Sequence, residues 1–344
     1  VHLTIDGKPV TAPAGASIVA AARLAGIEIP TLCHREGCTP ETSCLVCVAL
    51  VDGSPRLVPT CATTVAEGMV VESETEAVRA ARKMALELLL GDHAGDCVAP
   101  CRMACPAGMD IPEMLRLMRL GRMDEAVAVV KRRLPFPAIL GRICPAPCEG
   151  PCRRGELDEP VCIKDLKRAV GDHDLHSAAP YEPLLPPATG RRVAIIGAGP
   201  AGLSAAYELR RLGHAVTLLD DHDQPGGMMR YGVSPAELPA DVLDGEIARV
   251  LAVGMEWLPG KRLGRDVSLP QLQGAFDAVL LACGSLPPKE LAALGLQAAG
   301  KGVAVDQQTL QAALPGVFAA GGVVTPMKLA VRAVAQGHAA AHAI

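Results

Sequence analysis

The residues best suited to chemistry form a run of metal-binding side chains between positions 93 and 162. Cysteine thiolates are soft ligands that hold an iron–sulfur cube four at a time. Cys105 and Cys144 each precede a proline, and in two-cluster proteins such a cysteine commonly binds the other cube. The sequence therefore predicts two [4Fe-4S] clusters with interleaved ligands. The candidate ligands are one histidine and seven cysteines: His93, Cys97, Cys101, Cys105, Cys144, Cys148, Cys152 and Cys162.

A disulfide framework or a zinc site would use the same residue types. Disulfide frameworks are typical of short chains in oxidising compartments, whereas this chain has 344 residues and its first residues do not resemble a signal sequence. Zinc sites favour paired C-x2-C knuckles, and the spacing here is a repeated C-x3-C. Iron–sulfur clusters are therefore the favoured interpretation.

A second concentration of cysteines lies between positions 33 and 61. A [2Fe-2S] centre needs four thiolates, three on one loop and one delivered from a later strand. Cys44 and Cys47, with Cys61 downstream, are the strongest part of this pattern. The residues alone leave two candidates for the first ligand, Cys33 and Cys38.

A third motif predicts nucleotide binding. Residues 192–202 read as a buried strand that enters a Gly-x-Gly-x-x-Gly turn and a helix, and residues 216–220 read as a second strand that ends in Asp220. Such glycines let the backbone approach a pyrophosphate at the helix N-terminus, and the carboxylate receives ribose hydroxyls. The strand, turn, helix and acid together predict a dinucleotide-binding domain.

Short helices and a hairpin are expected to position these motifs. Alternating apolar and polar residues over 1–10, around Asp6-Gly7, predict a β-hairpin. Asp110 before Ile111-Pro112 predicts a capped helix start, and apolar residues at helical spacing on either side of Gly121 predict two short helices. Further helices are predicted from Ser17 to Ala25, over 76–90 and over 160–170 with Gly171 at the end, followed by a proline-rich linker over 178–187.

Composition excludes several classes of protein. The formal net charge is −4 and no basic run occurs, which argues against a nucleic-acid partner. No apolar stretch has the length of a membrane span, and a cytoplasmic location is expected. Aromatic residues make up only 2% of the chain, so alanine, valine and leucine must fill the interior. Bound clusters and a cofactor are expected to add stability, because ligand binding to the folded state stabilises it.

The first part of the chain resembles a known [2Fe-2S] domain. Pro-Thr-Leu-Cys33, ten residues, Cys44-x2-Cys47, thirteen residues and Cys61 match the ferredoxin-like domain that opens the large iron–sulfur subunit of respiratory complex I, many NAD-linked formate dehydrogenases and iron hydrogenases. The resemblance implies that Cys33 is the first ligand and Cys38 a spare thiol. It continues into Asp92-His93, and in that family the histidine of Asp-His-x3-Cys ligates a [4Fe-4S] cluster.

The middle part resembles the cluster domain of the glutamate synthase small subunit and of dihydropyrimidine dehydrogenase. The matching stretches are Cys105-Pro-Ala-Gly-Met-Asp-Ile-Pro, Pro135-Phe-Pro and Gly141-Arg-Ile-Cys-Pro-Ala-Pro-Cys-Glu-Gly-Pro-Cys-Arg-Arg. That family often completes its second cube with Gln or Glu near the position of Lys167; lysine is poorly suited to this role, and Cys162 is the predicted substitute. The resemblance implies one cube on His93, Cys97, Cys101 and Cys152, and the other on Cys105, Cys144, Cys148 and Cys162.

Residues 225–233, 278–284 and 316–322 resemble, in order, the FAD-domain blocks of the same family. In the family a complete NAD(P)H-binding domain lies between the last two blocks. The connection from Gly284 to Gly316 is too short for one, so that domain is expected to be absent. Gly322 replaces the family's aspartate, and a helix from about Pro326 is expected to aim Lys328 and Arg332 at the flavin. The implied FAD-binding residues are Gly197, Gly199, Pro200, Ala201, Gly202, Asp220, Gly226, Gly227, Gly284, Gly321, Gly322 and Met327.

Three domains are expected: an α+β, β-grasp [2Fe-2S] ferredoxin-like domain over 1–75, a helical double-[4Fe-4S] domain over 76–180, and an α/β Rossmann-type FAD domain over 181–344. The leading hypothesis is an electron-transfer subunit of a cytoplasmic formate dehydrogenase- or hydrogenase-like complex, with catalytic and further electron-transfer subunits as partners and no catalytic residues of its own. Two alternatives stay open. One is a stand-alone NAD(P)H-dependent flavoenzyme, and the other is a non-catalytic iron–sulfur scaffold that has lost FAD.

Overall fold

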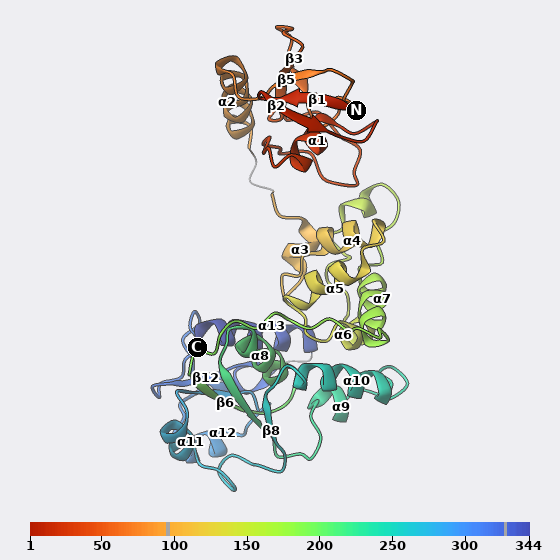
Figure 1. Cartoon of the computed structure of the whole chain (residues 1–344). Coiled ribbons are helices and arrows are strands. Elements are labelled where there is room, and N and C mark those ends of the chain that lie inside the picture. The colour runs from red at the N-terminus through yellow and green to blue at the C-terminus, as the bar shows by residue number, and fades with distance from the viewer. Residues whose placement is uncertain (94–96, 327–328) are drawn as a thin grey trace. The chain divides into compact units, whose positions relative to one another are not determined.

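The computed structural model describes residues 1–93, 97–326 and 329–344 (Figure 1). The chain divides into two compact units, Val1–Cys97 and Val98–Ile344, which we call the N-terminal and C-terminal units. Each unit is described by itself. Within the described ranges, every helix is too short or too polar to span a bilayer.

The N-terminal unit is built on a mixed five-stranded sheet in the order β2-β1-β5-β3-β4. β1 pairs with β5 in parallel, and the other neighbours are antiparallel. The predicted hairpin is confirmed: Asp6 and Gly7 have φ values of 48° and 75°, as a two-residue type I′ turn requires. The strands are β1 (His2–Ile5), β2 (Lys8–Thr11), β3 (Val48–Val51), β4 (Val58–Pro59) and β5 (Val70–Glu72).

Two helices complete this unit. α1 (Ile18–Leu24) begins after Ser17, whose Oγ accepts a hydrogen bond from Ala20 N at 3.3 Å, as predicted from the sequence. α2 (Glu76–Gly91) is fastened by the buried Arg82, which donates to Val48 O at 3.1 Å. The apolar face of α1 joins the core of the sheet, which also contains the Cys47 and Cys61 side chains.

The C-terminal unit begins with a group of short helices. Asp110 caps α4 by accepting from Glu113 N at 3.3 Å, and Gly121, with φ 71°, separates α4 from α5, so these predictions are confirmed. The elements are α3 (Pro100–Ala104), α4 (Ile111–Arg119), α5 (Met123–Lys131), α6 (Pro137–Ile143), the 3-10 helix η1 (Arg153–Glu156) and α7 (Ile163–Leu175).

The predicted end of the last of these helices at Gly171 is wrong, because α7 continues to Leu175. A Cβ atom at Gly171 would lie 2.3 Å from Ala138 N of α6, and one at Gly141 would lie 2.5 Å from Arg168 Cα of α7. Both glycines therefore allow the backbones of α6 and α7 to approach closely. Gly171 serves helix packing instead of helix termination.

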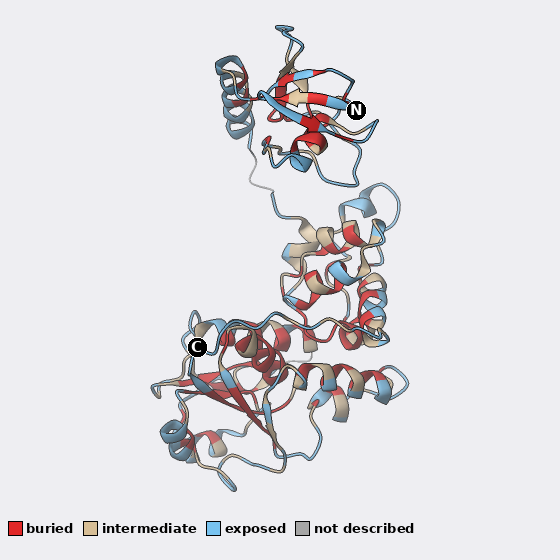
Figure 2. Cartoon of the chain, in the orientation of Figure 1, coloured by how far each residue is buried: buried red, intermediate tan, exposed pale blue. Residues whose placement is uncertain are grey.

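A parallel five-stranded sheet in the order β12-β9-β6-β7-β8 forms the second part of this unit. Apart from β8 and the first residues of β6 and β7, its strands are buried (Figure 2). Alternate residues of β6 face opposite layers: Val193 and Ile195 pack in the cluster that contains α8 and α13, and Ala194 and Ile196 pack in the cluster that contains α11 and α12. The strands are β6 (Arg192–Ile196), β7 (Ala215–Leu219), β8 (Glu256–Leu258), β9 (Ala278–Leu281) and β12 (Val317–Ala319).

The connection between the last two sheet strands is short. It contains α12 (Pro288–Ala293) and a small antiparallel ribbon of β10 (Ala298–Ala299) and β11 (Gly302–Val303). No parallel βαβ unit occurs in this stretch, all of which the structure describes. The remaining elements are α8 (Pro200–Arg211), α9 (Met228–Tyr231), α10 (Ala240–Leu251), α11 (Leu269–Ala275), η2 (Gly321–Val323) and α13 (Ala330–Ala343).

Candidate redox-cofactor sites

Four thiols of the N-terminal unit come together around the loop before β3. Cys44 and Cys47 lie on this loop and Cys61 follows β4; these three are 5%, 2% and 2% exposed. Thr60 Oγ1 donates to Cys47 O at 2.7 Å and ties the two segments together. Cys33 is half-buried in the preceding loop, whereas Cys38 is exposed.

The electrostatics of these thiols reflect their proximity. The pKa of Cys61 is raised to about 12, first by burial and then by the Cys47, Cys33 and Cys44 thiols. The pKa of Cys33 is lowered: burial opposes ionisation, but hydrogen bonds from the backbone and side chains of Cys44 and Ser43 outweigh it. Four sulfur atoms thus lie close together. Cys33 is favoured as a thiolate, whereas ionising Cys61 alone is costly. A cationic iron–sulfur cluster would stabilise the thiolate form of all four.

His93 and Cys97 end the N-terminal unit. His93 Nε2 lies 2.9 Å from Cys97 Sγ, so the two donor atoms are within reach of one metal atom. Residues 94–96 between them lie outside the described part of the chain.

The thiols of the C-terminal unit form two groups. Burial raises the pKa of Cys101, and the Cys152 and Cys105 thiols add to the effect. Burial also raises the pKa of Cys148, to about 11, with smaller contributions from Cys105 and Cys144. Cys105 and Cys144 are the C-caps of α3 and α6, and Cys152 precedes η1.

The two candidates to complete the second group differ in burial. Cys162 precedes α7 and is exposed. Lys167, one turn further along α7, is only 5% exposed, and its charge lowers the pKa of Cys148. The structure therefore places a buried ammonium beside Cys148 and leaves the Cys162 thiol in solvent. The assignment of Cys162 as a ligand stays a prediction.

A cavity of about 750 Å³ lies at the carboxyl ends of β6, β7 and β9. Its lining includes Gly197 after β6, Asp220 after β7 and Cys283 after β9. The order of the sheet places β7 and β9 on opposite sides of β6. Such a crevice between diverging connections is where open α/β sheets bind nucleotides.

Glycines make this cavity possible. Gly197 has φ 109°, and a Cβ there would lie 2.4 Å from Ala282 O. A Cβ at Gly202 would lie 1.8 Å from Gly197 O, which allows α8 to start directly behind the turn. Gly199 and Gly227 face each other closely, since a Cβ on Gly227 would lie 2.7 Å from Gly199 Cα. The cavity volume and the bare backbone at the start of α8 fit the pyrophosphate of a dinucleotide.

Asp220 is largely buried at the edge of this cavity. Its Oδ2 accepts from Ala198 N at 2.6 Å, and its Oδ1 accepts from His222 N at 2.9 Å. The carboxylate thus holds the glycine turn in place, and Oδ2 retains a further lone pair for a ribose hydroxyl. The His222 ring also contacts Asp220, which raises the pKa of His222, and it stacks on Tyr231 with ring centroids 4.5 Å apart.

The structure brings most of the predicted FAD-binding residues to this cavity. Gly202 packs behind the turn, Gly226 N donates to Ala198 O of the turn at 2.8 Å, and Gly321 N donates to Gln336 Oε1 at 2.7 Å. Met327 and Lys328 lie outside the described residues, and Arg332 is exposed and does not line the cavity. The predicted residues that line it are Gly197, Gly199, Pro200, Ala201, Asp220, Gly227, Gly284 and Gly322.

Sequence reasoning missed several lining residues. Lys261 and Arg262, from the loop after β8, bring positive charge that could meet a phosphate. They follow no recognisable motif, so no signal in the sequence could have found them. Ile143, the last residue of α6, also lines the cavity, and Cys144 follows it directly.

Family models match three consecutive stretches of the chain. Residues 1–76 match a 2Fe-2S iron-sulfur cluster binding domain, residues 73–179 match dihydropyrimidine dehydrogenase domain II, 4Fe-4S cluster, and residues 195–262 match an NAD(P)-binding Rossmann-like domain. The chain thus contains three successive stretches, each similar to one of these domain families. The resemblance and the fold classes expected from the sequence are thereby confirmed.

Curated relatives are similar to more than half of this chain. The NADP(+)-dependent formate dehydrogenase subunit beta of Moorella thermoacetica is 39% identical over 207 residues, which cover 54% of this chain and 29% of that protein. The NADPH-Fe(3+) oxidoreductase subunit beta of Geobacter sulfurreducens is 38% identical over 208 residues, which cover 59% of this chain and 31% of that protein. The glutamate synthase [NADPH] small chain of Mycobacterium tuberculosis is 38% identical over 208 residues, which cover 60% of this chain and 42% of that protein. The chain thus spans less than half the length of these relatives.

Proposed function

We propose that this chain is an iron–sulfur flavoprotein subunit that relays electrons between FAD and iron–sulfur clusters. The observation that carries the proposal is the position of α6. Its last residue, Ile143, lines the dinucleotide cavity, and the next residue, Cys144, belongs to the Cys105–Cys144–Cys148 group. A cluster on these thiols would therefore lie beside a flavin in the cavity, with only the wall of the cavity between them.

The proposed cofactors are one [2Fe-2S] cluster, two [4Fe-4S] clusters and FAD. FAD exchanges one or two electrons and the clusters exchange one electron each, so the protein's part is to set spacing and potential. The proximity of Cys33, Cys44, Cys47 and Cys61 supports the first cluster. The two thiol groups of the C-terminal unit support the other two clusters. In the N-terminal unit, the contact between His93 and Cys97 supports these two residues as ligands of one metal atom.

The proposed domain limits are 1–75, 76–180 and 181–344. The proposed setting is a multi-subunit oxidoreductase of the cytoplasm, in which partner subunits carry out the substrate chemistry, as in formate dehydrogenase- or hydrogenase-like complexes. The names of two relatives as β subunits support partner subunits.

The test uses the full chain, purified anaerobically with its clusters and flavin. After rapid mixing with one electron equivalent of dithionite, absorbance and freeze-quench EPR follow the electron. We expect cluster and flavin signals to re-equilibrate within a turnover time. Cluster and flavin signals that for seconds stay away from the distribution set by their separately measured potentials would refute the relay. A chain that binds no FAD would support the scaffold alternative.

A stand-alone NAD(P)H-dependent flavoenzyme is the second candidate, because NADP(+) or NADPH appears in the names of all three relatives described above. The connection between β9 and β12 offers only α12 and a two-stranded ribbon for that nucleotide. We therefore expect neither NADH nor NADPH to bleach the flavin of the isolated chain at a useful rate. Rapid bleaching without a partner would favour this second candidate.

A further inference from the structure

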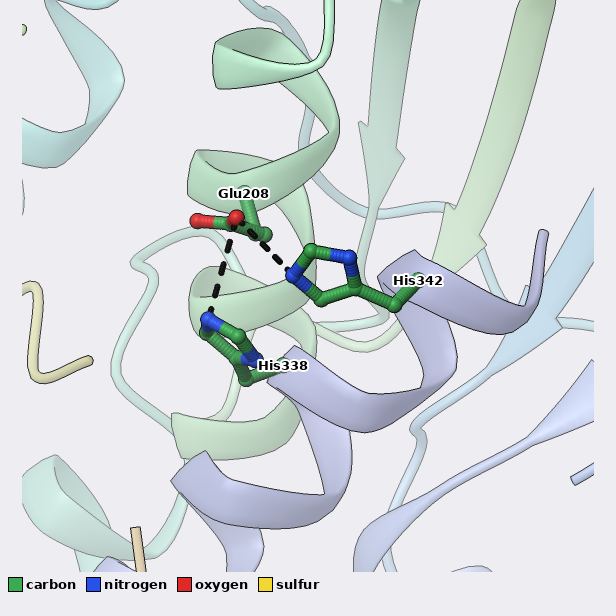
Figure 3. A group of neighbouring side chains, drawn as sticks. All are labelled: Glu208, His338 and His342. Carbon is green, nitrogen blue, oxygen red and sulfur yellow. Dashed lines mark ion pairs between the residues drawn. The ribbon is translucent and has the colours of Figure 1, made fainter. Parts of the chain in front are cut away.

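Helices α8 and α13 carry a second set of metal-ligand side chains, separate from the cysteines. Glu208 lies on α8, and His338 and His342 lie one turn apart on the same face of α13. His342 Nε2 is 3.1 Å from Glu208 Oε1, and His338 Nε2 is 3.7 Å from the same oxygen (Figure 3). One donor atom from each residue lies within 4.8 Å of the other two.

Close packing of the two helices holds this group together. A Cβ at Gly337 would lie 2.1 Å from Ala201 O, so the backbones of α13 and α8 are in contact at this point. Ser204 Oγ donates to Val334 O at 3.0 Å one turn further along. The three donor atoms therefore project from two helices that cannot slide past each other without losing these contacts.

Neighbouring groups orient two of the three side chains. Arg211 donates to Glu208 Oε2 at 2.6 Å and leaves Oε1 directed at the histidines. The His338 ring forms a hydrogen bond with the Arg132 backbone, and its Nδ1 lies 3.5 Å from an Arg133 nitrogen, so its Nε2 is the atom that faces Glu208. Metal-binding histidines and carboxylates are usually held in this way through the atom that does not bind the metal.

We propose that Glu208 Oε1, His338 Nε2 and His342 Nε2 bind one divalent transition-metal ion, with zinc as the best match. Two imidazoles and one carboxylate suit zinc, which takes four ligands in a tetrahedron. Three come from the protein, and the fourth is solvent, because the His342 side chain is 50% exposed while the Glu208 side chain is 7% exposed. Four ligands at Zn–N or Zn–O distances of about 2.0–2.1 Å lie roughly 3.3 Å from one another in a tetrahedron, so the separations of 3.1 Å and 3.7 Å between Glu208 Oε1 and the two histidines need only small adjustments.

The position of the ion gives it a structural role. α8 begins at the glycine turn of the dinucleotide cavity, and Leu329, Ala330 and Ala333 at the start of α13 line that cavity. An ion between the two helices fixes two walls of the cavity at once. Binding to the folded state alone stabilises that state.

Two cations work against a divalent ion here, the guanidinium groups of Arg211 and Arg133. Without metal, the same atoms form a polar latch in which His342 pairs with Glu208. If the three residues form only this polar contact, the protein takes up no zinc at them. If they form a metal site, zinc binds with nitrogen and oxygen neighbours, so zinc uptake and the zinc environment distinguish the two.

The experiment uses anaerobically purified holoprotein with its clusters loaded, so that cluster cysteines do not compete for zinc. Zinc is titrated calorimetrically, metal content is measured by mass spectrometry after desalting, and the zinc edge is examined by X-ray absorption. We expect one zinc per chain, nitrogen and oxygen neighbours at about 2.0–2.1 Å with no sulfur at about 2.3 Å, and a higher Tm with zinc than without.

His342→Ala is the decisive variant, because its half-exposed side chain can be shortened without a core cavity. We expect at least about tenfold weaker zinc binding and no zinc-dependent rise in Tm. His2→Ala, which removes an exposed histidine paired with Glu67 in the N-terminal unit, is the matched control and should bind zinc normally. Absence of zinc binding, sulfur in the zinc shell, or unchanged uptake in His342→Ala would overturn the proposal.

Discussion

The Glu246 side chain accepts a hydrogen bond from the backbone N–H of Ile139 at 2.7 Å, and its other oxygen accepts one from Ala138 N at 2.8 Å. A carboxyl group on α10 thus caps the first turn of α6 from more than a hundred residues away along the chain. α6 ends at Ile143 beside the dinucleotide cavity and leads into Cys144. This single buried side chain therefore helps to set the distance between the Cys144 thiol and the dinucleotide cavity.

Glu246→Gln should destabilise the protein. An amide offers one acceptor oxygen to two N–H groups, so one buried donor loses its partner, at a cost of about 1–3 kcal/mol in the free energy of unfolding. Anaerobic thermal unfolding followed by circular dichroism measures the loss. Asp241→Asn, an exposed change on the same helix, is the control and should stay within about 0.5 kcal/mol of the wild type. Equal stability of the two variants would contradict the capping role.

The same residue predicts a pH dependence. Burial raises the pKa of Glu246 from 4.5 to about 8, although the two backbone N–H groups and Lys131 oppose the shift. Between these two values the folded state keeps the Glu246 proton, whereas the unfolded state has released it. The contribution of Glu246 to the free energy of unfolding therefore falls as pH rises from 4.5 towards 8. Gln cannot titrate. The stability difference between the wild type and Glu246→Gln should therefore narrow between pH 6 and pH 8.5; a gap that widens over that range would exclude a raised pKa.

Local signals in the sequence predicted the parts of the structure that local chemistry determines. Asp6-Gly7 predicted the hairpin, and Asp110 predicted the start of α4. The glycine turn predicted the strand–turn–helix of the nucleotide domain. Gly171 was misread because a glycine in a close helix crossing has the same local signature as one that ends a helix. The roles of Glu246 and Lys261 depend on contacts between distant segments, for which one sequence contains no signal.

The [2Fe-2S] ligand set predicts the effect of single thiol changes. Cys47→Ser should abolish the [2Fe-2S] EPR signal of the reduced chain, because Cys47 is buried beside Cys61 and a lost ligand leaves the centre incomplete. Cys38→Ser is the matched control: its thiol is exposed, and the signal should persist. Loss of the signal in Cys38→Ser would mean that the first ligand is Cys38 and not Cys33.

The proposed clusters predict about ten irons per chain, from one two-iron and two four-iron clusters. Cys162→Ser should lower the content towards about six, or to about nine with a [3Fe-4S] EPR signal if the cube loses only one iron. Iron analysis and EPR on anaerobically reconstituted protein distinguish these cases. Asp165→Asn, an exposed change on the same turn of α7, serves as the control. An unchanged iron content and EPR spectrum in Cys162→Ser would show that another group is the fourth ligand of this cube. Lys167 is the buried group beside Cys148.

Gly322→Asp should tighten FAD binding. Gly322 lines the cavity, and a Cβ there would meet Gly284 Cα at 3.4 Å and Ser285 N at 3.5 Å, so a side chain fits with a small adjustment. One charge-assisted hydrogen bond to the flavin is worth about 1.5–3 kcal/mol, or roughly ten- to a hundredfold in Kd.

Gly322→Asn is the control for Gly322→Asp, because asparagine has the same shape without the charge and should gain much less. Flavin fluorescence during titration of apoprotein with FAD measures both constants. If Asp and Asn bind FAD equally well, the gain does not come from a charged hydrogen bond. If Asp binds FAD more weakly than glycine does, the carboxylate points at the phosphates, and the flavin lies in the opposite orientation along the cavity.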